Sequence, residues 1–272
     1  MSHHVWVRGL PLWCEPRRLL GPGDWALEGR SARADLAVHE AADVVARLRG
    51  IGIGGSPLEV TVEPALPRAA VRAARTTDAR RRRDTTPGFT RPDTRLDPEG
   101  RVSLTPEALA LALGERAAGR TVVDAGCGAG GNTIGFARAG AHVVAIERDA
   151  ARLADARHNA RVYGVADRVR WVHGALEDVL PTLSADILFV DPPWGVDWSR
   201  TCTPLAALPA LAHAMTLRER FGELWAKVPP SFDVRELDGA RAEAWYGTAA
   251  GDRRRVKFLV VRVGSGGRDP LA

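Results

Sequence analysis

The segment Asp191, Pro192, Pro193, Trp194 combines residue types that could hold an aromatic amine. It follows the apolar run ADILFV, which is typical of a buried parallel strand, so it is expected at the carboxyl end of that strand. The two prolines fix φ and lack N–H donors, which leaves carbonyl oxygens free and holds Asp191 rigidly. A carboxylate and a carbonyl can orient an exocyclic amine, while Trp194 offers a stacking surface worth about 1 to 3 kcal/mol for a nucleobase. These features suit methylation of that amine, a reaction governed mainly by positioning.

A glycine-rich turn provides a second chemical signal. The segment VVDAGCGAGGNT, residues 122–133, indicates a strand, a tight turn and a helix start, and its glycines let the backbone approach a ligand closely. Asp124 precedes the first of these glycines, and Glu147 ends the next strand-like run, where it could accept hydrogen bonds from both ribose hydroxyls. Arg148 could signal the extra phosphate of NADP, but the pattern D-x-G-x-G differs from the dinucleotide pattern G-x-G-x-x-G. The acids favour a cationic adenosyl cofactor.

The elements that must position these residues form a βαβα pattern. The runs TVVDAG, HVVAIE, VRWVHG and ADILFVDPP are short and rich in β-branched residues, and helical stretches separate them. ELWAKVP predicts a fifth strand, and RAEAWYG with RRVKFLVVRV predicts an antiparallel pair. We therefore expect an α/β fold with a mostly parallel seven-stranded sheet, in which the acids gather at the carboxyl ends of the strands.

The chain divides into three predicted regions. Residues 1–78 contain two strand-like runs and an amphipathic helical segment, ADLAVHEAADVVARLRG, and predict a small accessory α/β domain. Residues 79–102 are rich in Arg and Pro and predict a linker, or a loop that orders on a partner. Residues 103–272 begin with SLTPEALALALGERA, a helix-start pattern, and contain the strands and motifs described above.

Composition narrows the possible environments and partners. The three cysteines stand far apart without a CxxC pair, so we expect no metal site. No apolar run is long enough for a membrane span, and the N-terminus lacks the order of a signal peptide, which favours a cytoplasmic protein. The net charge is +5, and four consecutive arginines could neutralise phosphates of an RNA or a nucleotide, or could form a solvated face. These are Arg80, Arg81, Arg82 and Arg83.

Two further aromatic residues are candidate substrate contacts. Trp198 follows the Asp-Pro-Pro-Trp segment closely and could stack or line the rim of a site, or serve only in packing. Phe89 lies in the arginine-rich region, and both could cover the bound substrate. His158 and His173 are expected at the surface or in packing rather than in catalysis.

Beyond these patterns, the chain resembles the trimethylguanosine synthase family, the RNA cap guanine-N2 methyltransferases of the class I, S-adenosylmethionine-dependent fold. The resemblance rests on GGNTI, on ARHNARVYGVADRV and on PPWG, together with LDPEGRVSLTPEAL upstream and AKVPPSFDV and EAWYG downstream. It covers about residues 93–262, and the chain is similar to a bacterial-type member. It implies a class I, Rossmann-like methyltransferase that uses S-adenosyl-L-methionine in RNA methylation.

The resemblance also implies roles for individual residues. Glu147 would hold the ribose, Asp191, Pro192 and Pro193 would orient the amine beside the cofactor, and Trp194 would stack on guanine. Two positions depart from the family pattern. Members often have Ser where Asp191 stands. Ala175 replaces an acid, which leaves recognition of the cofactor's adenine ring to Glu177, Asp178 or backbone. The methionine portion of the cofactor would lie against Asp124, Gly126, Gly128, Asn132 and Thr133.

Several functions remain compatible with these residues. Methylation of guanine N2 in RNA or in a guanine nucleotide is the leading hypothesis. Adenine N6 methylation of RNA or DNA suits the Asp-Pro-Pro-Trp segment equally well. A small-molecule N-methyltransferase of a biosynthetic pathway, and a nucleic-acid-binding homologue without catalysis, complete the alternatives.

Overall fold

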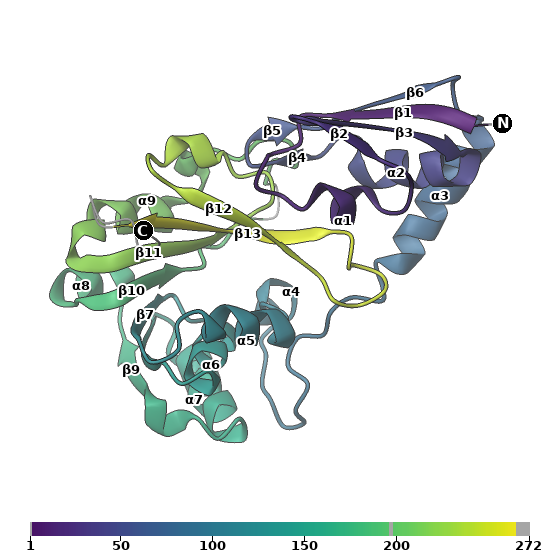
Figure 1. The fold of residues 1–272 in the computed structure, drawn as a ribbon. Coiled ribbons are helices and arrows are strands. Elements are labelled where there is room, and N and C mark those ends of the chain that lie inside the picture. Colours follow the sequence, from purple (N-terminus) through teal and green to yellow (C-terminus); the bar gives the residue numbers. More distant parts are fainter. Residues whose placement is uncertain (1, 196–197, 265–272) are drawn as a thin grey trace.

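The computed structural model describes residues 2–195 and 198–264, so the ends of the predicted outer regions, at residues 1 and 265–272, lie outside the described residues. The chain forms an N-terminal unit, residues 2–81, and a C-terminal unit, residues 107–264, which lie side by side (Figure 1). A connecting segment, residues 82–106, joins them.

Seven strands form the sheet of the C-terminal unit, in the order β12-β13-β11-β10-β7-β8-β9. The five strands from β11 to β9 are parallel to one another, whereas β13 runs antiparallel to both β11 and β12. The predicted α/β architecture with a mostly parallel seven-stranded sheet is therefore confirmed. The strand bounds are β7 Thr121–Ala125, β8 His142–Glu147, β9 Val169–His173, β10 Ala185–Val190, β11 Phe221–Val228, β12 Arg241–Tyr246 and β13 Val256–Gly264.

Helices cover both faces of this sheet because successive strand residues point to opposite sides. Val122 and Ile187 pack with one apolar cluster that includes residues of α5, α6 and α7, while their neighbours Val123 and Leu188 pack with a second cluster that includes residues of α8 and α9. The helices are α5 Glu107–Glu115, α6 Gly131–Arg138, α7 Ala150–Val162, α8 Leu176–Val179 and α9 Pro209–Thr216. Short 3-10 turns occupy Ala166–Arg168, Leu180–Thr182, Leu205–Ala207, Arg218–Arg220 and Val234–Glu236.

The N-terminal unit is a four-stranded antiparallel sheet, in the order β2-β3-β1-β6, packed with helices. Its strands are β1 Ser2–Arg8, β2 Ala26–Glu28, β3 Ser31–Ala37 and β6 Glu59–Glu63, and its helices are α1 Pro16–Leu20, α2 Val38–Leu48 and α3 Arg68–Arg81. Helix α3 runs through the predicted boundary at residue 78 and contains Arg80 and Arg81, so the structural break falls later than the sequence indicated.

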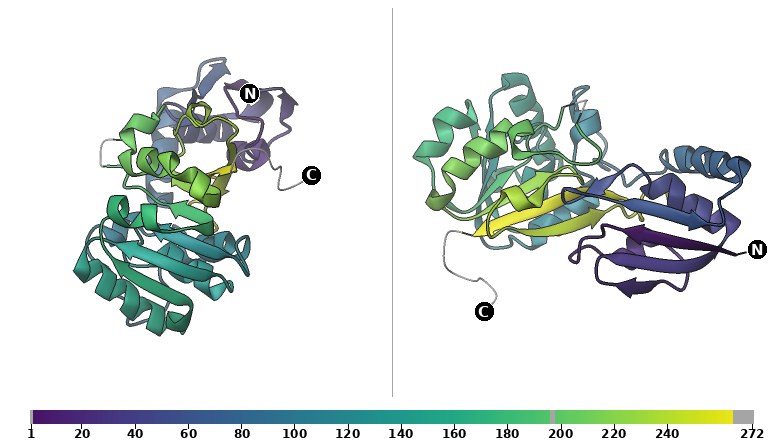
Figure 2. Two further views of the ribbon diagram at one scale, coloured as in Figure 1. Left: turned by 90° about the vertical axis from the view of Figure 1, so that its left-hand side faces the viewer. Right: turned by 90° about the horizontal axis from the view of Figure 1, so that it is seen from above.

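The two units share a continuous apolar core. Val5 and Leu36 of the N-terminal sheet belong to the same buried cluster as Leu188 and Leu224 of the C-terminal sheet. A hairpin formed by β4 Gly52–Ile53 and β5 Ser56–Pro57 reaches the C-terminal unit, where the Gly52 N–H donates to the Arg200 carbonyl at 2.8 Å. A Cβ at Gly52 would lie 1.8 Å from the Thr201 carbonyl oxygen, so this approach requires glycine. Figure 2 shows the β12–β13 hairpin extending toward the N-terminal unit.

The connecting segment packs along the C-terminal unit instead of forming a free linker. The Thr90 backbone N–H and hydroxyl donate to Glu107 at 2.8 and 2.7 Å, and the Arg95 N–H donates to the Asn159 side chain at 2.7 Å. The segment includes the short helix α4, Gly100–Ser103. Helix α5 begins at Glu107, directly after Pro106, within the segment SLTPEALALALGERA where the sequence predicts a helix start.

Within the described residues, no helix is both long and apolar enough to cross a membrane.

Candidate active site

The carboxyl ends of adjacent parallel strands bring four polar residues to one edge of the sheet. Asp124 lies near the end of β7, Glu147 ends β8, Asp191 follows β10, and Lys227 lies near the end of β11. Open α/β sheets bind their ligands at this edge. The predicted meeting of the two motif acids with Asp191 is therefore seen in the strand arrangement, and Lys227 joins them.

Asp124 is a buried acid with one unpartnered oxygen. Its side chain is 1% exposed, and the Thr133 hydroxyl donates to Oδ2 at 2.5 Å. The other oxygen, Oδ1, is buried and lacks a hydrogen-bond partner among the described residues. Burial, with the nearby charges of Asp191 and Glu147, raises the pKa of Asp124 to about 7. A buried carboxylate oxygen of this kind is suited to a cationic or N–H-bearing ligand group.

The glycine turn leaves open space beside Asp124. Gly126 and Gly128 have φ of +88° and +54°, in the region that favours glycine, and a Cβ placed on either would meet nothing within 4 Å. Helix α6 starts just beyond, at Gly131, where unpaired N–H groups can receive polar groups. Together with the unpartnered Asp124 oxygen, this open cradle fits an adenosyl cofactor that carries a positive charge.

Glu147 is held by the backbone of the same turn. Its carboxylate is 7% exposed and accepts hydrogen bonds from the N–H groups of Gly128 and Asp149, each at 2.9 Å. Each carboxylate oxygen has a second lone pair, so the side chain can still accept bonds from two hydroxyl groups. The two backbone bonds fix its orientation toward the glycine turn.

Asp191 is oriented through one oxygen only. The Asn132 amide donates to Oδ2 at 2.9 Å, and the Lys227 ammonium donates to the same oxygen at 2.7 Å. Asn132 and Lys227 are 8% and 4% exposed, whereas the Asp191 side chain is 17% exposed. No partner of Oδ1 is found in the described part of the chain, so this oxygen remains available as an acceptor.

Lys227 was not among the residues that the sequence motifs indicated. The signal was a lysine near the end of a buried central strand, in the run ELWAKVP, where a charge is rarely placed without a partner. Its ammonium also lies 5.5 Å from the ring centroid of Trp194 and 5.4 Å from that of Phe258. These contacts fix the position of Lys227 between Asp191 and two aromatic rings.

The Pro-Pro-Trp segment forms a fixed wall beside Asp191. Pro192 is buried and Pro193 is exposed, and the half-buried Trp194 packs against both apolar clusters. Trp198 contacts Trp194 edge to face, with ring centroids 5.9 Å apart. The indole Nε1 of Trp194 is buried without a hydrogen-bond partner among the described residues. Trp194 and Trp198 thus form a rigid aromatic pair next to the acid.

Phe89 does not join the residues around Asp191. Its ring packs on Tyr163, with centroids 5.4 Å apart, at the residue that caps the C-terminus of α7. Because α7 returns from the carboxyl edge of the sheet to the amino edge, Phe89 lies away from Asp191, and its placement does not support the expected substrate contact. His158 is half-buried and His173 is exposed, and they bond the carbonyls of Asp93 and Arg148.

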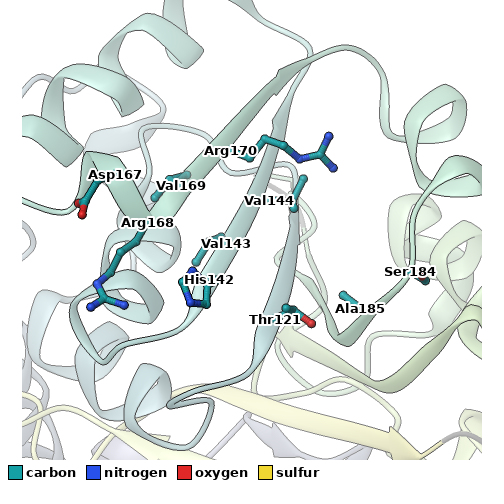
Figure 3. Close-up of a pocket in the computed structure, with 10 residues that line it drawn as sticks. All are labelled: Thr121, His142, Val143, Val144, Asp167, Arg168, Val169, Arg170, Ser184 and Ala185. Carbon is teal, nitrogen blue, oxygen red and sulfur yellow. The ribbon is translucent and has the colours of Figure 1, made fainter.

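A surface hollow of about 340 Å³ lies at the opposite, amino edge of the sheet (Figure 3). Its lining includes Thr121, His142, Arg168 and Arg170, and Figure 3 shows the two arginines pointing away from one another. The described residues contain no group of His, Cys, Asp or Glu side chains that could hold a metal ion. The chemistry-bearing residues lie at the carboxyl edge, so the hollow is not the candidate active site.

The sheet order, the glycine turn and the acids at the strand ends define a class I methyltransferase fold, whose cofactor is S-adenosyl-L-methionine. Residues 119–203 match the sequence family described as RNA cap guanine-N2 methyltransferase. This match contains the glycine turn, Glu147 and the Asp-Pro-Pro-Trp segment.

Several curated proteins are similar to about a third of the chain. The chain is 41% identical over 99 residues to an uncharacterized RNA methyltransferase of Gloeobacter violaceus, covering 36% of this chain and 20% of that protein. It is 34% identical over 110 residues to trimethylguanosine synthase of Schizosaccharomyces pombe, covering 37% and 46%. It is 35% identical over 102 residues to a 23S rRNA uracil-C5 methyltransferase of Acidithiobacillus ferrooxidans, covering 35% and 23%. The chain therefore spans less than half the length of these curated relatives.

A solved structure has a similar overall fold. A putative methyltransferase from Porphyromonas gingivalis aligns with a TM-score of 0.52 at 19% sequence identity, over 86% of this chain and 58% of that one. At this identity the similarity concerns the fold, and it agrees with the class that the sheet defines.

Proposed function

We propose that this protein is an S-adenosyl-L-methionine-dependent RNA methyltransferase that methylates an exocyclic amine, with guanine N2 of an RNA or a guanine nucleotide as the leading target. The observation that carries the proposal is that the two carboxylate oxygens of Asp191 have different partners. Two buried donors occupy Oδ2, which leaves Oδ1 to accept an N–H from a substrate amine beside the cofactor cradle.

The cofactor-binding roles follow from the geometry of the glycine turn. S-adenosyl-L-methionine supplies an electrophilic methyl group when bound. Asp124 would hold the positive methionine portion through its buried oxygen, Gly126 and Gly128 would allow close approach, and Glu147 would accept hydrogen bonds from the ribose hydroxyls. Thr133 orients Asp124, and the unpartnered Oδ1 of Asn132 is a further acceptor.

The substrate roles belong to Asp191, Trp194 and the prolines between them. Asp191 Oδ1 accepts one N–H of the amine and turns the nitrogen lone pair toward the methyl group, while Trp194 stacks on the base and Trp198 holds that indole in place. The methylated ammonium is acidic and loses its proton after transfer, so Asp191 acts by orientation and needs no strong basicity.

Guanine is supported by the family description of residues 119–203 and by the relative named trimethylguanosine synthase. Arg80, Arg81, Arg82 and Arg83 form the exposed end of α3 and the residues after it, and they supply positive charge for RNA phosphates.

Adenine N6 is the second candidate target, and the observation that favours it is the acid at position 191. A carboxylate oxygen with Pro192 after it can accept from an adenine amine as readily as from a guanine amine. The identity of the base therefore has to be read from the product.

The test is to incubate the purified protein with methyl-labelled S-adenosyl-L-methionine and, separately, with total RNA, DNA and guanine nucleotides. The products are digested to nucleosides and identified by mass spectrometry, with Asp191→Ala as the inactive control. Label in N2-methylguanosine would support the proposal, and label in N6-methyladenosine would replace guanine by adenine. Cofactor binding without label in any nucleic acid or nucleotide would refute the proposed RNA activity and redirect the search to small molecules.

A further inference from the structure

Four arginines from the two units line one cleft of about 440 Å³. Arg17 and Arg18 come from α1 of the N-terminal unit, whereas Arg253 and Arg254 come from the turn between β12 and β13 of the C-terminal unit. Gly21 completes the wall beside Arg254. We call this feature the arginine cleft.

The arginines of the cleft differ in how firmly they are bound by the protein. Arg18 donates to the carbonyls of Gly247 and Arg253 at 3.1 Å and lies over the Tyr246 ring, 4.5 Å from its centroid. By contrast, the half-buried Arg254 guanidinium makes no hydrogen bond or ion pair with any of the residues that the structure describes. Arg18 therefore builds the wall, and Arg254 is available to a ligand.

Gly21 makes room for the Arg254 guanidinium. Its φ is +88°, and a Cβ at this position would lie 3.0 Å from Arg254 Nη1. Within the described ranges, the exposed Arg17 side chain makes only a long contact of 3.5 Å, to the Trp25 carbonyl. Two guanidinium groups with free donors thus face one space.

Positive charge accumulates around Arg254 without a matching acid. Burial and the nearby charge of Arg47 lower the pKa of Arg254. The charge of Asp43 acts in the opposite direction, but this acid accepts from Arg47 and Arg81, each at 2.8 Å. An anion in the cleft would relieve this crowding. Phosphate is the anion that arginine binds best, because the guanidinium fork can donate two hydrogen bonds to its oxygens.

The cleft lies at the same edge of the sheet as the candidate active site. Strand β12 ends and β13 begins at this edge, and Phe258 of β13 lies 5.4 Å from Lys227 Nζ. Arg254 stands four residues before Phe258, so at most about 14 Å of extended chain separates the two. A polymer with a base at Asp191 could therefore place a neighbouring phosphate in the cleft.

We propose that Arg17 and Arg254 bind a backbone phosphate of the nucleic-acid strand whose base enters the Asp191 site. This inference rests on the proposed RNA methyltransferase function. It assigns the N-terminal unit a direct part in substrate binding, through α1.

The test measures binding of a short single-stranded RNA containing guanine, by fluorescence anisotropy at several KCl concentrations. Arg17→Gln/Arg254→Gln is compared with the wild-type chain and with the control Arg168→Gln/Arg170→Gln at the opposite edge of the sheet. GTP binding serves as a second arm, because its phosphates could occupy the same cleft. Calorimetric binding of S-adenosyl-L-methionine reports whether each variant remains folded and able to bind cofactor.

We expect the cleft variant to bind RNA at least about tenfold more weakly. Its salt slope should be shallower by about 0.7 for each phosphate that the variant no longer neutralises. Binding of GTP and cofactor should be unchanged, and the control should match the wild type. Wild-type RNA affinity in the cleft variant would overturn the proposal while leaving RNA methylation by the wild type intact. Weaker binding of GTP alone would assign the cleft to a free nucleotide instead, and a wild-type chain that neither binds nor methylates RNA would overturn both proposals.

Discussion

Lys227 and Asp191 form a buried ion pair, with 2.7 Å between the ammonium nitrogen and Oδ2, across the strands β10 and β11. The Asn132 amide shares the same carboxylate oxygen. The pair directs Asp191 Oδ1 outward, and it makes the acid dependent on a residue from the neighbouring strand.

Replacing Lys227 by Met should destabilise the fold and abolish methyl transfer. Removal of Lys227 leaves the half-buried Asp191 carboxylate without its counter-ion, which costs at most about 3 to 5 kcal/mol. The double variant Asp191→Asn/Lys227→Met should recover most of the unfolding free energy but not the activity. Urea denaturation and methyl-transfer assays of the three proteins measure both effects. Full activity in Lys227→Met would show that orientation of the substrate amine does not depend on the ion pair between Asp191 and Lys227.

Cofactor affinity should depend on pH through Asp124. Its pKa of about 7 means that the acid is partly protonated at neutral pH, and a cationic ligand binds the carboxylate form. The affinity for S-adenosyl-L-methionine should therefore be about tenfold weaker at pH 6 than at pH 8. Isothermal titration calorimetry across this range, with Asp124→Asn as the comparison, measures the dependence. A flat profile in the wild type would contradict it.

The raised pKa of Asp124 also affects folding stability, which should fall as pH rises, whereas cofactor affinity should increase. The pKa of Asp124 is raised from 3.8 to about 7, so the folded chain holds this proton more tightly than the unfolded chain. Stability from this group is full below pH 3.8 and is lost as pH rises through 7. Asp124→Asn, which cannot ionise, should raise the unfolding free energy relative to the wild type by more at pH 8 than at pH 5, because only part of this stability is lost by pH 5. Thermal unfolding at both pH values would reveal the difference.

Glu107 should anchor the connecting segment. Burial acts to raise its pKa, but hydrogen bonds from Tyr163, Thr90 and Arg138 outweigh it and lower the pKa to about 2. Stability from this group is present above pH 4.5 and is lost as pH falls toward 2. Glu107→Gln should cost about 1.5 to 3 kcal/mol at neutral pH. Limited proteolysis should then cut within residues 82–106, while Glu115→Gln, on the same helix, should leave the segment protected.

Trp194 should tolerate Phe better than Ala. Its Nε1 has no partner among the described residues, so Phe loses no hydrogen bond and keeps a stacking face. Trp194→Ala should raise the KM for RNA by about 5- to 150-fold, from the 1 to 3 kcal/mol of a lost stack. Steady-state kinetics with a cofactor-binding control checks this. An unchanged KM in a folded Trp194→Ala protein would limit the residue to packing.

The sheet could be predicted because each of its parallel strands is marked by its own short stretch of sequence. Each parallel strand is an apolar, β-branched run with a polar residue at its carboxyl end, so Asp124, Glu147 and Asp191 could be placed at one edge from the sequence alone. Lys227 could not be placed there in the same way, because its role depends on which strand lies next to β10. That neighbour is fixed by tertiary pairing, and no motif encodes it.

The connecting segment and the domain boundary were harder for a related reason. The composition of residues 79–102 resembles a flexible linker, yet Arg95 and Asp97 bond Asn159 and Arg152 of α7, which lie far along the chain. Likewise the boundary at residue 78 falls inside α3, because Asp78 is buried by Arg82 and Arg255 instead of marking an exposed end. Both errors arose where distant residues supplied the partners.

The apolar cluster that runs from the N-terminal sheet into the seven-stranded sheet couples the stability of the two units. Val5 and Leu224 belong to one buried apolar cluster, so unfolding of either unit exposes apolar side chains of the other. A protein cut between residues 82 and 106 would therefore not yield an independent catalytic module. Such a cut would separate two units whose buried apolar side chains pack in one cluster, and those side chains would then face water.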